Sequence, residues 1–267
     1  MNESAVGSLD HGSSRIGQMS PAGARWQPGY REWLPPAALR DSLTCLWVSV
    51  TPAGQPSVTD VLPDGCADFI WQSGLGAYVA GPDTGPAPAH LPPGTVLVGA
   101  RFRPGAGGPA LGLPLADLRD QRVDLAAFLP ALGRQLPADL PAELALDIVT
   151  RRIGELVSTG RPDRAVLHGA TLLADAVSVT ELSDTLGLSE RQLRRRFDAA
   201  VGYGPKTLHR VLRFRRALTR LTETGPAANL ADVAIQTGYA DQAHLTREMT
   251  RLAGRPPAAL ARTFSRS

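Results

Sequence analysis

Two segments of the chain repeat one helical pattern, and this duplication constrains the fold more than any other feature. The first segment is TELSDTLGLSERQLRRRFDAAVGYGPKTL (180–208), and the second is DVAIQTGYADQAHLTREMTRLAGRPPAAL (232–260). Five positions recur at an offset of 52: Leu193 as Leu245, Phe197 as Met249, Gly202 as Gly254, Pro205 as Pro257 and Leu208 as Leu260. A chain with such an internal repeat is expected to build two similar helical units.

Each unit has the features of a helix, a sharp turn and a second helix. Gly187 follows the first helix and tolerates the left-handed backbone that such a turn needs. Ser189, with Gln192 three residues later, matches a capping box, and Asp241 is the expected cap in the second unit. This is the helix-turn-helix pattern, in which the second helix enters the major groove of DNA.

The outer face of the second helix in the first unit is strongly basic. Leu193 and Phe197, four residues apart, point inward, which leaves Arg191, Arg194 and Arg195 outside and Arg196 near the edge. Such a face is either an ordinary solvated surface or a surface that meets phosphate and bases. The duplication favours the second interpretation. Between the units, 205–225 is expected to form one long helix that holds them at a fixed separation.

Charge divides the chain into two parts. Residues 1–160 contain 11 Arg and 15 Asp or Glu, a net charge of −4, whereas 161–267 contain 16 Arg and one Lys against 10 acidic residues, a net charge of +7. Such asymmetry indicates two domains with different partners, and the basic one favours a polyanion.

Short apolar or alternating runs, separated by Gly and Pro, predict strands at 42–50, 57–63, 67–72, 76–81 and 95–102, and a helical pattern follows at 115–135. The expected fold class is α+β: a small N-terminal β-barrel or sandwich with helices, then an all-α domain of two helix-turn-helix units. The expected boundaries are a disordered tail at 1–25, a β-rich domain at 26–160, a linker and lead-in at 161–174 and the DNA-binding domain at 175–267.

The stretches ELSDTLGLSERQLRRRF, RFRRALTRL and DVAIQTGYADQAHLTREM, followed by RLAGRPPAAL, resemble the AraC/XylS family of bacterial transcription regulators. The resemblance covers 175–262. It departs from the family pattern at Met249 and Thr250, where the family usually has Phe and Lys, and at Leu260, where it usually has Tyr. The missing lysine removes one expected phosphate contact.

The resemblance implies positions for contact with double-stranded DNA. The expected base-reading residues are Arg191, Arg194, Arg195, Gln242, Ala243, His244, Thr246 and Arg247. The expected backbone contacts are Ser189, Arg196 and Arg251. An arginine can bind guanine O6 and N7 bidentately, glutamine suits adenine, and Ala or Thr can touch a thymine methyl group. The resemblance also implies an asymmetric DNA site of nearly two helical turns. Because members of the family commonly activate transcription, we expect this protein to be an activator.

For the N-terminal domain, VLPDGCADFIW and GARFRPGAGGPALGLPLADL resemble an uncharacterised domain of some actinobacterial members. In the family, such domains bind a small-molecule effector, dimerise, or both. Arg101 and Arg103, two apart, would share a face of an extended strand and meet an anionic ligand, or they would be solvated. Asp64, Cys66 and Asp68 alternate in the same way, and we read them as a surface or core edge rather than a metal site.

Several function classes lack support in the sequence. It contains no P-loop, dinucleotide fingerprint, HExxH or GxSxG motif, so we expect no enzyme and no cofactor or metal. The apolar runs are too short for a membrane span, and no apolar signal core opens the chain, so we expect a cytoplasmic protein. The competing functional interpretation is a ligand-independent transcription factor whose first domain binds a protein, such as RNA polymerase or a second copy of this chain.

Overall fold

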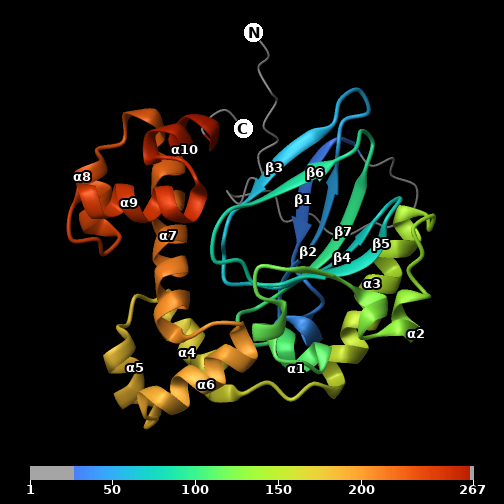
Figure 1. The fold of residues 1–267 in the computed structure, drawn as a ribbon, viewed down its shortest axis with the longest axis horizontal. Helices are drawn as coiled ribbons and strands as arrows, with labels where there is room; N and C mark the ends of the chain where they lie inside the picture. The colour runs from blue at the N-terminus through green and yellow to red at the C-terminus, as the bar shows by residue number, and fades with distance from the viewer. Residues whose placement is uncertain (1–26, 265–267) are drawn as a thin grey trace.

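A computed structural model describes residues 27–264 of the chain, and the tail expected at 1–25 lies outside them. A β-rich part comes first, and an all-helical part follows it (Figure 1). This order confirms the predicted fold class. Among the helices of the described residues, none combines the length and the apolar character that a membrane span requires.

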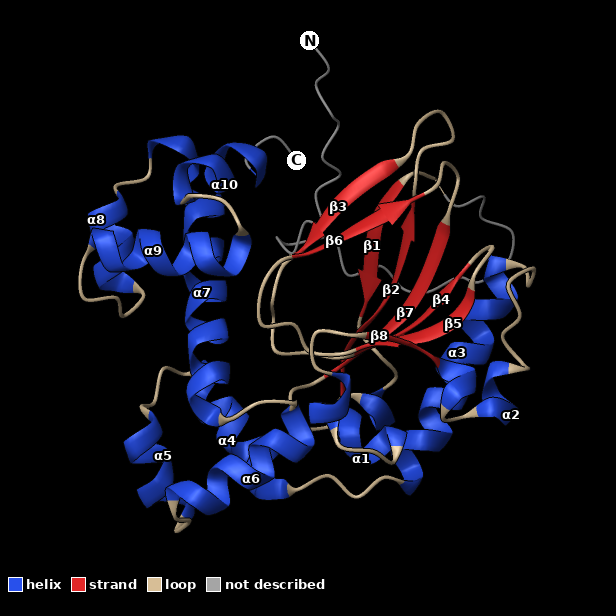
Figure 2. Ribbon diagram, viewed as in Figure 1, coloured by secondary structure: helices blue, strands red, loops and turns tan. Residues whose placement is uncertain are grey.

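The β-rich part contains a six-stranded antiparallel sheet and a two-stranded sheet that lies over one of its faces (Figure 2). In spatial order the larger sheet has β1 (Gly29–Trp33), β2 (Leu43–Val50), β7 (Val96–Phe102), β4 (Asp68–Gln72), β5 (Gly76–Ala80) and β8 (Arg122–Asp124). The smaller sheet pairs β3 (Ser57–Val61) with β6 (Ala87–Leu91). All five predicted strands are confirmed. The three strands that were not predicted are short and polar or contain proline, so they lack the apolar pattern of a central strand.

Alternating side chains give the larger sheet two different faces. One face packs against α3 (Ala142–Thr159), and Phe69, Trp71 and Val98 belong to this main hydrophobic core. The other face carries Trp47, Ile70 and Leu97 and turns toward β3 and β6. The first face is therefore closed by a helix, while the second is left to line a cavity.

The segment 115–135 is less helical than its pattern predicts. It contains the 3₁₀ turns η2 (Leu115–Leu118) and η3 (Leu125–Ala127), the short helix α2 (Pro130–Gly133), and strand β8 between the two turns. Pairing with the edge of β5 holds 122–124 in extended form, which overrides the local helical pattern. The short helix α1 (Gly107–Leu111) precedes this segment.

Seven helices form the C-terminal part of the described chain. They are α4 (Arg164–Ala174), α5 (Val179–Leu186), α6 (Glu190–Val201), α7 (Pro205–Thr224), α8 (Leu230–Gln236), α9 (Gln242–Ala253) and α10 (Pro257–Phe264). The predicted long helix is α7, which stands upright between the two units in Figure 1. Its first half contributes Leu208 and Val211 to the core of the first unit, and its second half contributes Phe214 and Leu221 to the core of the second. One helix thus belongs to both cores and fixes their separation.

The helix α4 belongs structurally to the first helical unit. Val166, Ala170 and Leu173 pack in the same hydrophobic cluster as Leu193 and Phe197. We therefore propose that the DNA-binding domain begins at α4, within the segment 161–174 expected as linker and lead-in.

Both helical units contact the β-rich part. In the first unit, the backbone at Gly202 runs so close to Pro82 and Leu115 that an added Cβ would clash with both. In the second unit, Arg255 Nη2 lies 2.7 Å from Asp60 Oδ2 of β3. The β-rich part is therefore packed against both units at once.

Candidate DNA-binding surface and interdomain cavity

The turn before α6 has the geometry that the sequence predicts. Gly187 is left-handed, with φ of 60°, and ends α5. Ser189 Oγ accepts a hydrogen bond from Gln192 N at 3.3 Å, while Gln192 Oε1 accepts one from Ser189 N at 2.9 Å. The capping box is therefore confirmed, and it fixes the start of the helix that carries the arginines.

Three of the four α6 arginines are exposed. Arg191, Arg194 and Arg195 all face solvent. The side chain of Arg194 is 79% exposed and lies 3.6 Å from Asp198, a surface pair one turn along the helix. Arg196 is half-buried, and its Nη1 lies 3.4 Å from Asp163 Oδ2 at the start of α4. The first three therefore lie where DNA can reach them, whereas Arg196 is half-buried in its ion pair with Asp163.

The corresponding helix α9 exposes a less charged surface. Gln242, Ala243 and Arg247 are exposed, as is Arg251 in the last turn. His244 is half-buried, with its ring edge-on to Tyr239 at a centroid distance of 5.2 Å. Because His244 Nδ1 accepts a hydrogen bond from Ala240 N at 3.4 Å, its Nε2 is the nitrogen left to donate. The hydroxyl of Thr246, also on α9, already donates to the carbonyl of Gln242 at 2.8 Å.

The cap of α6 predicts a specific stability effect. Replacing Ser189 with alanine should lower the free energy of unfolding by about 1 kcal/mol, because the backbone N–H groups at the start of α6 lose their acceptor. Ser189→Gly should cost only a few tenths of that, since glycine is a tolerated cap. Urea denaturation of the two variants measures the difference. Equal losses in both variants would argue against a capping role for the hydroxyl.

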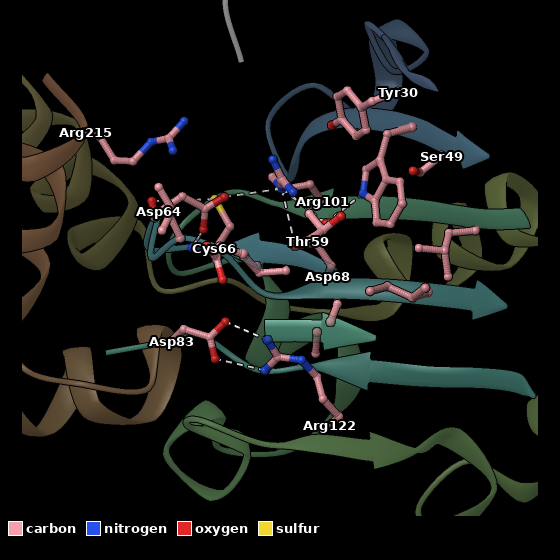
Figure 3. A pocket seen from close by; sticks show the side chains of 18 of the residues that line it. Tyr30, Ser49, Thr59, Asp64, Cys66, Asp68, Asp83, Arg101, Arg122 and Arg215 are labelled. Atoms are coloured by element: carbon pink, nitrogen blue, oxygen red, sulfur yellow. Dashed lines mark hydrogen bonds and ion pairs between the residues drawn. The ribbon is translucent and has the colours of Figure 1, made fainter. Parts of the chain in front are cut away.

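A cavity of about 250 Å³ lies between the open face of the larger sheet, the β3–β6 sheet and α7 (Figure 3). Its apolar walls include Ile70, Leu91, Leu97 and Leu218. Three aromatic residues, Tyr30, Trp47 and Tyr78, also line it. The cavity is thus bounded on one side by the β-rich part and on the other by the helix that joins the two helical units.

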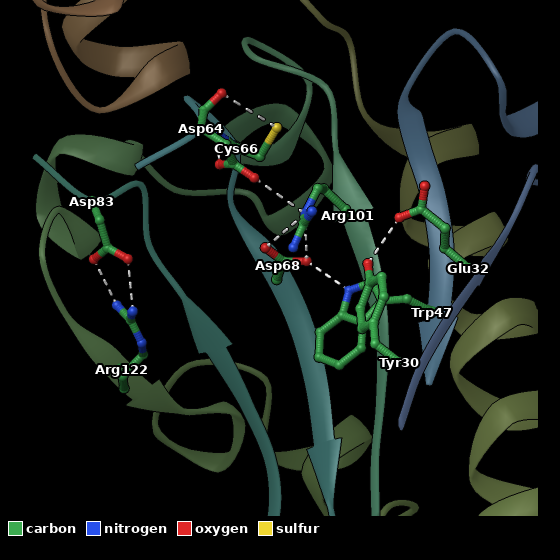
Figure 4. A network of polar contacts seen from close by, with 9 residues as sticks. All are labelled: Tyr30, Glu32, Trp47, Asp64, Cys66, Asp68, Asp83, Arg101 and Arg122. Atoms are coloured by element: carbon green, nitrogen blue, oxygen red, sulfur yellow. Dashed lines mark hydrogen bonds and ion pairs between the residues drawn. The ribbon is translucent and has the colours of Figure 1, made fainter. Parts of the chain in front are cut away.

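A buried polar network forms one wall of this cavity (Figure 4). Arg101 Nε lies 3.1 Å from Asp68 Oδ1 and 3.4 Å from Asp64 Oδ2, and Trp47 Nε1 donates to Asp68 Oδ1 at 2.8 Å. Burial raises the pKa of Asp68, and the Arg101 guanidinium offsets that rise only in part. Burial also works against the charged form of Arg101, but Asp68 and Asp64 together raise its pKa well above the ordinary value.

A second ion pair lies further along the same wall. Arg122 donates from Nη1 and Nη2 to the two carboxylate oxygens of Asp83, at 2.9 and 2.7 Å. This bidentate geometry is the strong form of an arginine–carboxylate contact. Across the cavity, Arg215 extends from α7 toward the sheet (Figure 3).

The structure separates the two arginines proposed as ligand contacts. Arg101 lines the cavity, as do Asp64, Cys66 and Asp68. Arg103 does not, and the expectation that both share one face is wrong. Strand β7 ends at Phe102, so Arg103 turns away, is exposed, and donates from Nε to the carbonyl of Arg40 at 2.7 Å.

Both cysteines are unsuited to thiolate chemistry in this structure. Burial raises the pKa of Cys45 to about 12 and that of Cys66 well above its usual range, and Asp64 adds to the rise at Cys66. Within residues 27–264, no group of three His, Cys, Asp or Glu side chains is placed to hold a metal ion.

The chain matches two family models. Residues 182–263 match a helix-turn-helix domain, and residues 31–124 match a domain of unknown function, DUF6597. The first match spans the capped N-termini of α6 and α9, where Ser189 and Asp241 are the caps. The chain therefore joins an AraC-type helix-turn-helix domain to a DUF6597 domain.

The solved structures that the chain matches include AraC family proteins. A probable AraC family transcriptional regulator from Rhodopseudomonas palustris CGA009 is 19% identical, with a TM-score of 0.34 over 39% of this chain and 97% of that one. ToxT from Vibrio cholerae O395 is 9% identical, with a TM-score of 0.44 over 82% of this chain and 97% of its own. Unsaturated fatty acid-bound ToxT from strain SCE256 is 11% identical, with a TM-score of 0.39 over 82% and 94%. No curated protein matches the sequence.

The AraC-type domain supports assignment of the protein to the DNA-binding transcription regulators. Sequence reasoning found the exposed positions of this domain but missed, among the charged residues that line the cavity, Asp83, Arg122 and Arg215. Asp83 and Arg122 lie in a proline-rich turn and a short edge strand, with no pattern that links them. Arg215 is one of several arginines on α7, and only packing of α7 against the sheet distinguishes it from its neighbours.

Proposed function

We propose that the protein is a transcription regulator that reads two adjacent major grooves with α6 and α9. The observation that carries this proposal is the pair of capped helices on a shared α7, each with an exposed polar face. Arg191, Arg194 and Arg195 are the base-reading residues of the first helix, and Gln242, Ala243 and Arg247 are those of the second. We propose His244 and Thr246 as further base contacts, and Ser189, Arg196 and Arg251 as contacts to the DNA backbone.

Selection of bound genomic fragments with the purified protein, at two salt concentrations, tests this assignment. We expect one recurring asymmetric site of about two helical turns, since a single chain carries two unlike reading surfaces. Binding without a common motif, lost steeply as salt rises, would mean that the arginines hold only phosphate, and the proposal would fail.

We further propose that a small molecule in the interdomain cavity controls DNA binding. The cavity has mixed apolar and charged walls and borders α7, so occupancy there is positioned to change how the two helical units are held. From the family resemblance we expect the liganded protein to activate transcription, which a reporter gene placed downstream of the selected site would measure.

The alternative function is a ligand-independent factor whose first domain binds a protein. The exposed apolar residues of the described β-rich part, Leu34, Val58, Leu75 and Leu144, come from separate elements. An enclosed polar and apolar cavity favours a small-molecule sensor over this alternative.

A further inference from the structure

Among the charged residues that line the described cavity wall, Arg215 stands out because its guanidinium has no partner there. Its side chain is half-buried, because the guanidinium faces the cavity rather than open solvent (Figure 3). It forms no hydrogen bond or ion pair with any residue that the structure describes. Burial lowers the pKa of Arg215, nearby Asp64 opposes that effect, and Arg101 adds to it.

Every other described charged residue that lines the cavity already has an ionic partner. Arg101 contacts Asp64 and Asp68, and Arg122 contacts Asp83. Asp60 pairs with Arg255 at 2.7 Å, and Glu223 with Arg220 at 3.4 Å. Arg215 is therefore the one charge of the described cavity wall without a partner.

A half-buried guanidinium that faces a cavity needs an acceptor. It carries five N–H donors in a planar fork and does not lose its charge in proteins. Removing such a group from water without a counter-charge is unfavourable. A carboxylate suits this fork best, because its two oxygens accept two parallel hydrogen bonds.

The opposite wall limits how much negative charge a ligand can bring. Asp64 and Asp68 both place a carboxylate on this part of the wall, where both contact Arg101. A second anionic group on the ligand would lie toward these carboxylates and be repelled. The rest of the ligand instead faces apolar and aromatic residues, among them Ile70, Leu97 and Tyr78.

We propose that the effector is a compact organic monocarboxylate, with its carboxylate bound by Arg215 and its apolar body held against the open face of the β-sheet. This inference rests on the proposed ligand control and adds the ligand class and the residue that recognises it. The cavity volume of about 250 Å³ favours a single ring or a short branched chain over a long acyl chain.

The position of Arg215 also explains how occupancy would reach the DNA-binding surfaces. The residue lies on α7, between Phe214 and Leu218, which belong to the core of the second unit. A carboxylate bound there joins α7 to the β-rich part through the ligand. Binding then restrains the helix that holds α6 and α9 apart.

The test uses the full-length protein and matched pairs of ligands. Isothermal titration calorimetry measures the dissociation constants of benzoate, phenylacetate, 3-phenylpropionate and cyclohexanecarboxylate. The dissociation constant of each acid is compared with that of its neutral amide, and phthalate is included as a dianion. The variant is Arg215→Gln, which keeps a long polar side chain without the charge. Arg210→Gln is the control, since Arg210 lies on the same helix and is also half-buried, and neither Arg210 nor its ionic partner Glu248 lines the cavity.

We expect at least one monocarboxylate to bind about tenfold to a hundredfold more tightly than its amide, the gain typical of a charge-assisted contact. Arg215→Gln should abolish that preference, while Arg210→Gln should retain it. Preferential binding of amides or of phthalate, an unchanged preference in Arg215→Gln, or no binding by any of the acids would each overturn the inference. The selection of DNA fragments is a separate experiment, so failure of the ligand proposal would leave the DNA-binding proposal untouched, and the reverse also holds.

Discussion

Replacing Arg191, Arg194 and Arg195 together with alanine is expected to abolish sequence preference in one half of the DNA site. Each guanidinium that reads a base contributes about 1–3 kcal/mol of discrimination, so the triple variant should lose a factor of a hundred or more between the selected site and a scrambled one. All three side chains are exposed on α6, and the buried Leu193 and Phe197 keep the helix in place. The fold should therefore survive. Fluorescence anisotropy with the two DNAs measures the ratio.

A control with the same loss of charge separates base reading from general attraction. Arg31, Arg134 and Arg151 are exposed residues of the β-rich part, and their joint replacement with alanine should leave the specificity ratio unchanged. If the α6 variant weakens binding to both DNAs equally and mainly flattens the salt dependence, its arginines hold phosphate rather than bases.

Replacing Arg101 with alanine is expected to lower the free energy of unfolding by about 3–5 kcal/mol, because it leaves two buried carboxylates without their cation. Asp64 and Asp68 both contact Arg101, and each is mostly covered by protein. Arg103→Ala is the matched control: this residue is two positions along, exposed and outside the cavity. Its effect should stay below about 1 kcal/mol. A similar decrease in the free energy of unfolding in both variants would contradict the special role proposed for the network of Arg101, Asp64 and Asp68.

The loss in Arg101→Ala should also depend on pH. Burial already raises the pKa of Asp68 in the folded protein, and Arg101 opposes that rise. Without Arg101, the pKa of Asp68 in the folded protein rises further above its value in the unfolded chain. At a pH between these two pKa values, the folded variant therefore binds more protons than the unfolded chain. Its stability then falls as pH rises through that window. Urea denaturation at pH 5 and pH 8 should show the larger loss at pH 8; a larger loss at pH 5 would contradict this account.

Local pattern was enough to predict most elements of the fold. The duplication predicted both turns, the capping box at Ser189 and the long helix α7, because helix caps and turn glycines depend on neighbours only a few residues away. Each of the five predicted strands has an apolar or alternating run of its own. The pattern failed where partners in other strands decide the structure, as at β8, or where burial is set by the helix's neighbours. Leu144, an apolar residue in the first turn of α3, is 51% exposed.

The residues of the candidate site also fall into two groups, those that local sequence pattern predicts and those that only tertiary contacts bring together. The sequence by itself determined the helix-turn-helix units and the arginines on the outer face of α6, since helical spacing alone separates inward from outward positions. Only the tertiary structure decided that Arg101 is bound by Asp64 and Asp68, and that Arg103 lies outside the cavity. It also decided that Arg215, from a helix more than a hundred residues further along the chain, faces the same cavity. Contacts between distant segments depend on how the sheet and α7 pack together, and no local spacing encodes that.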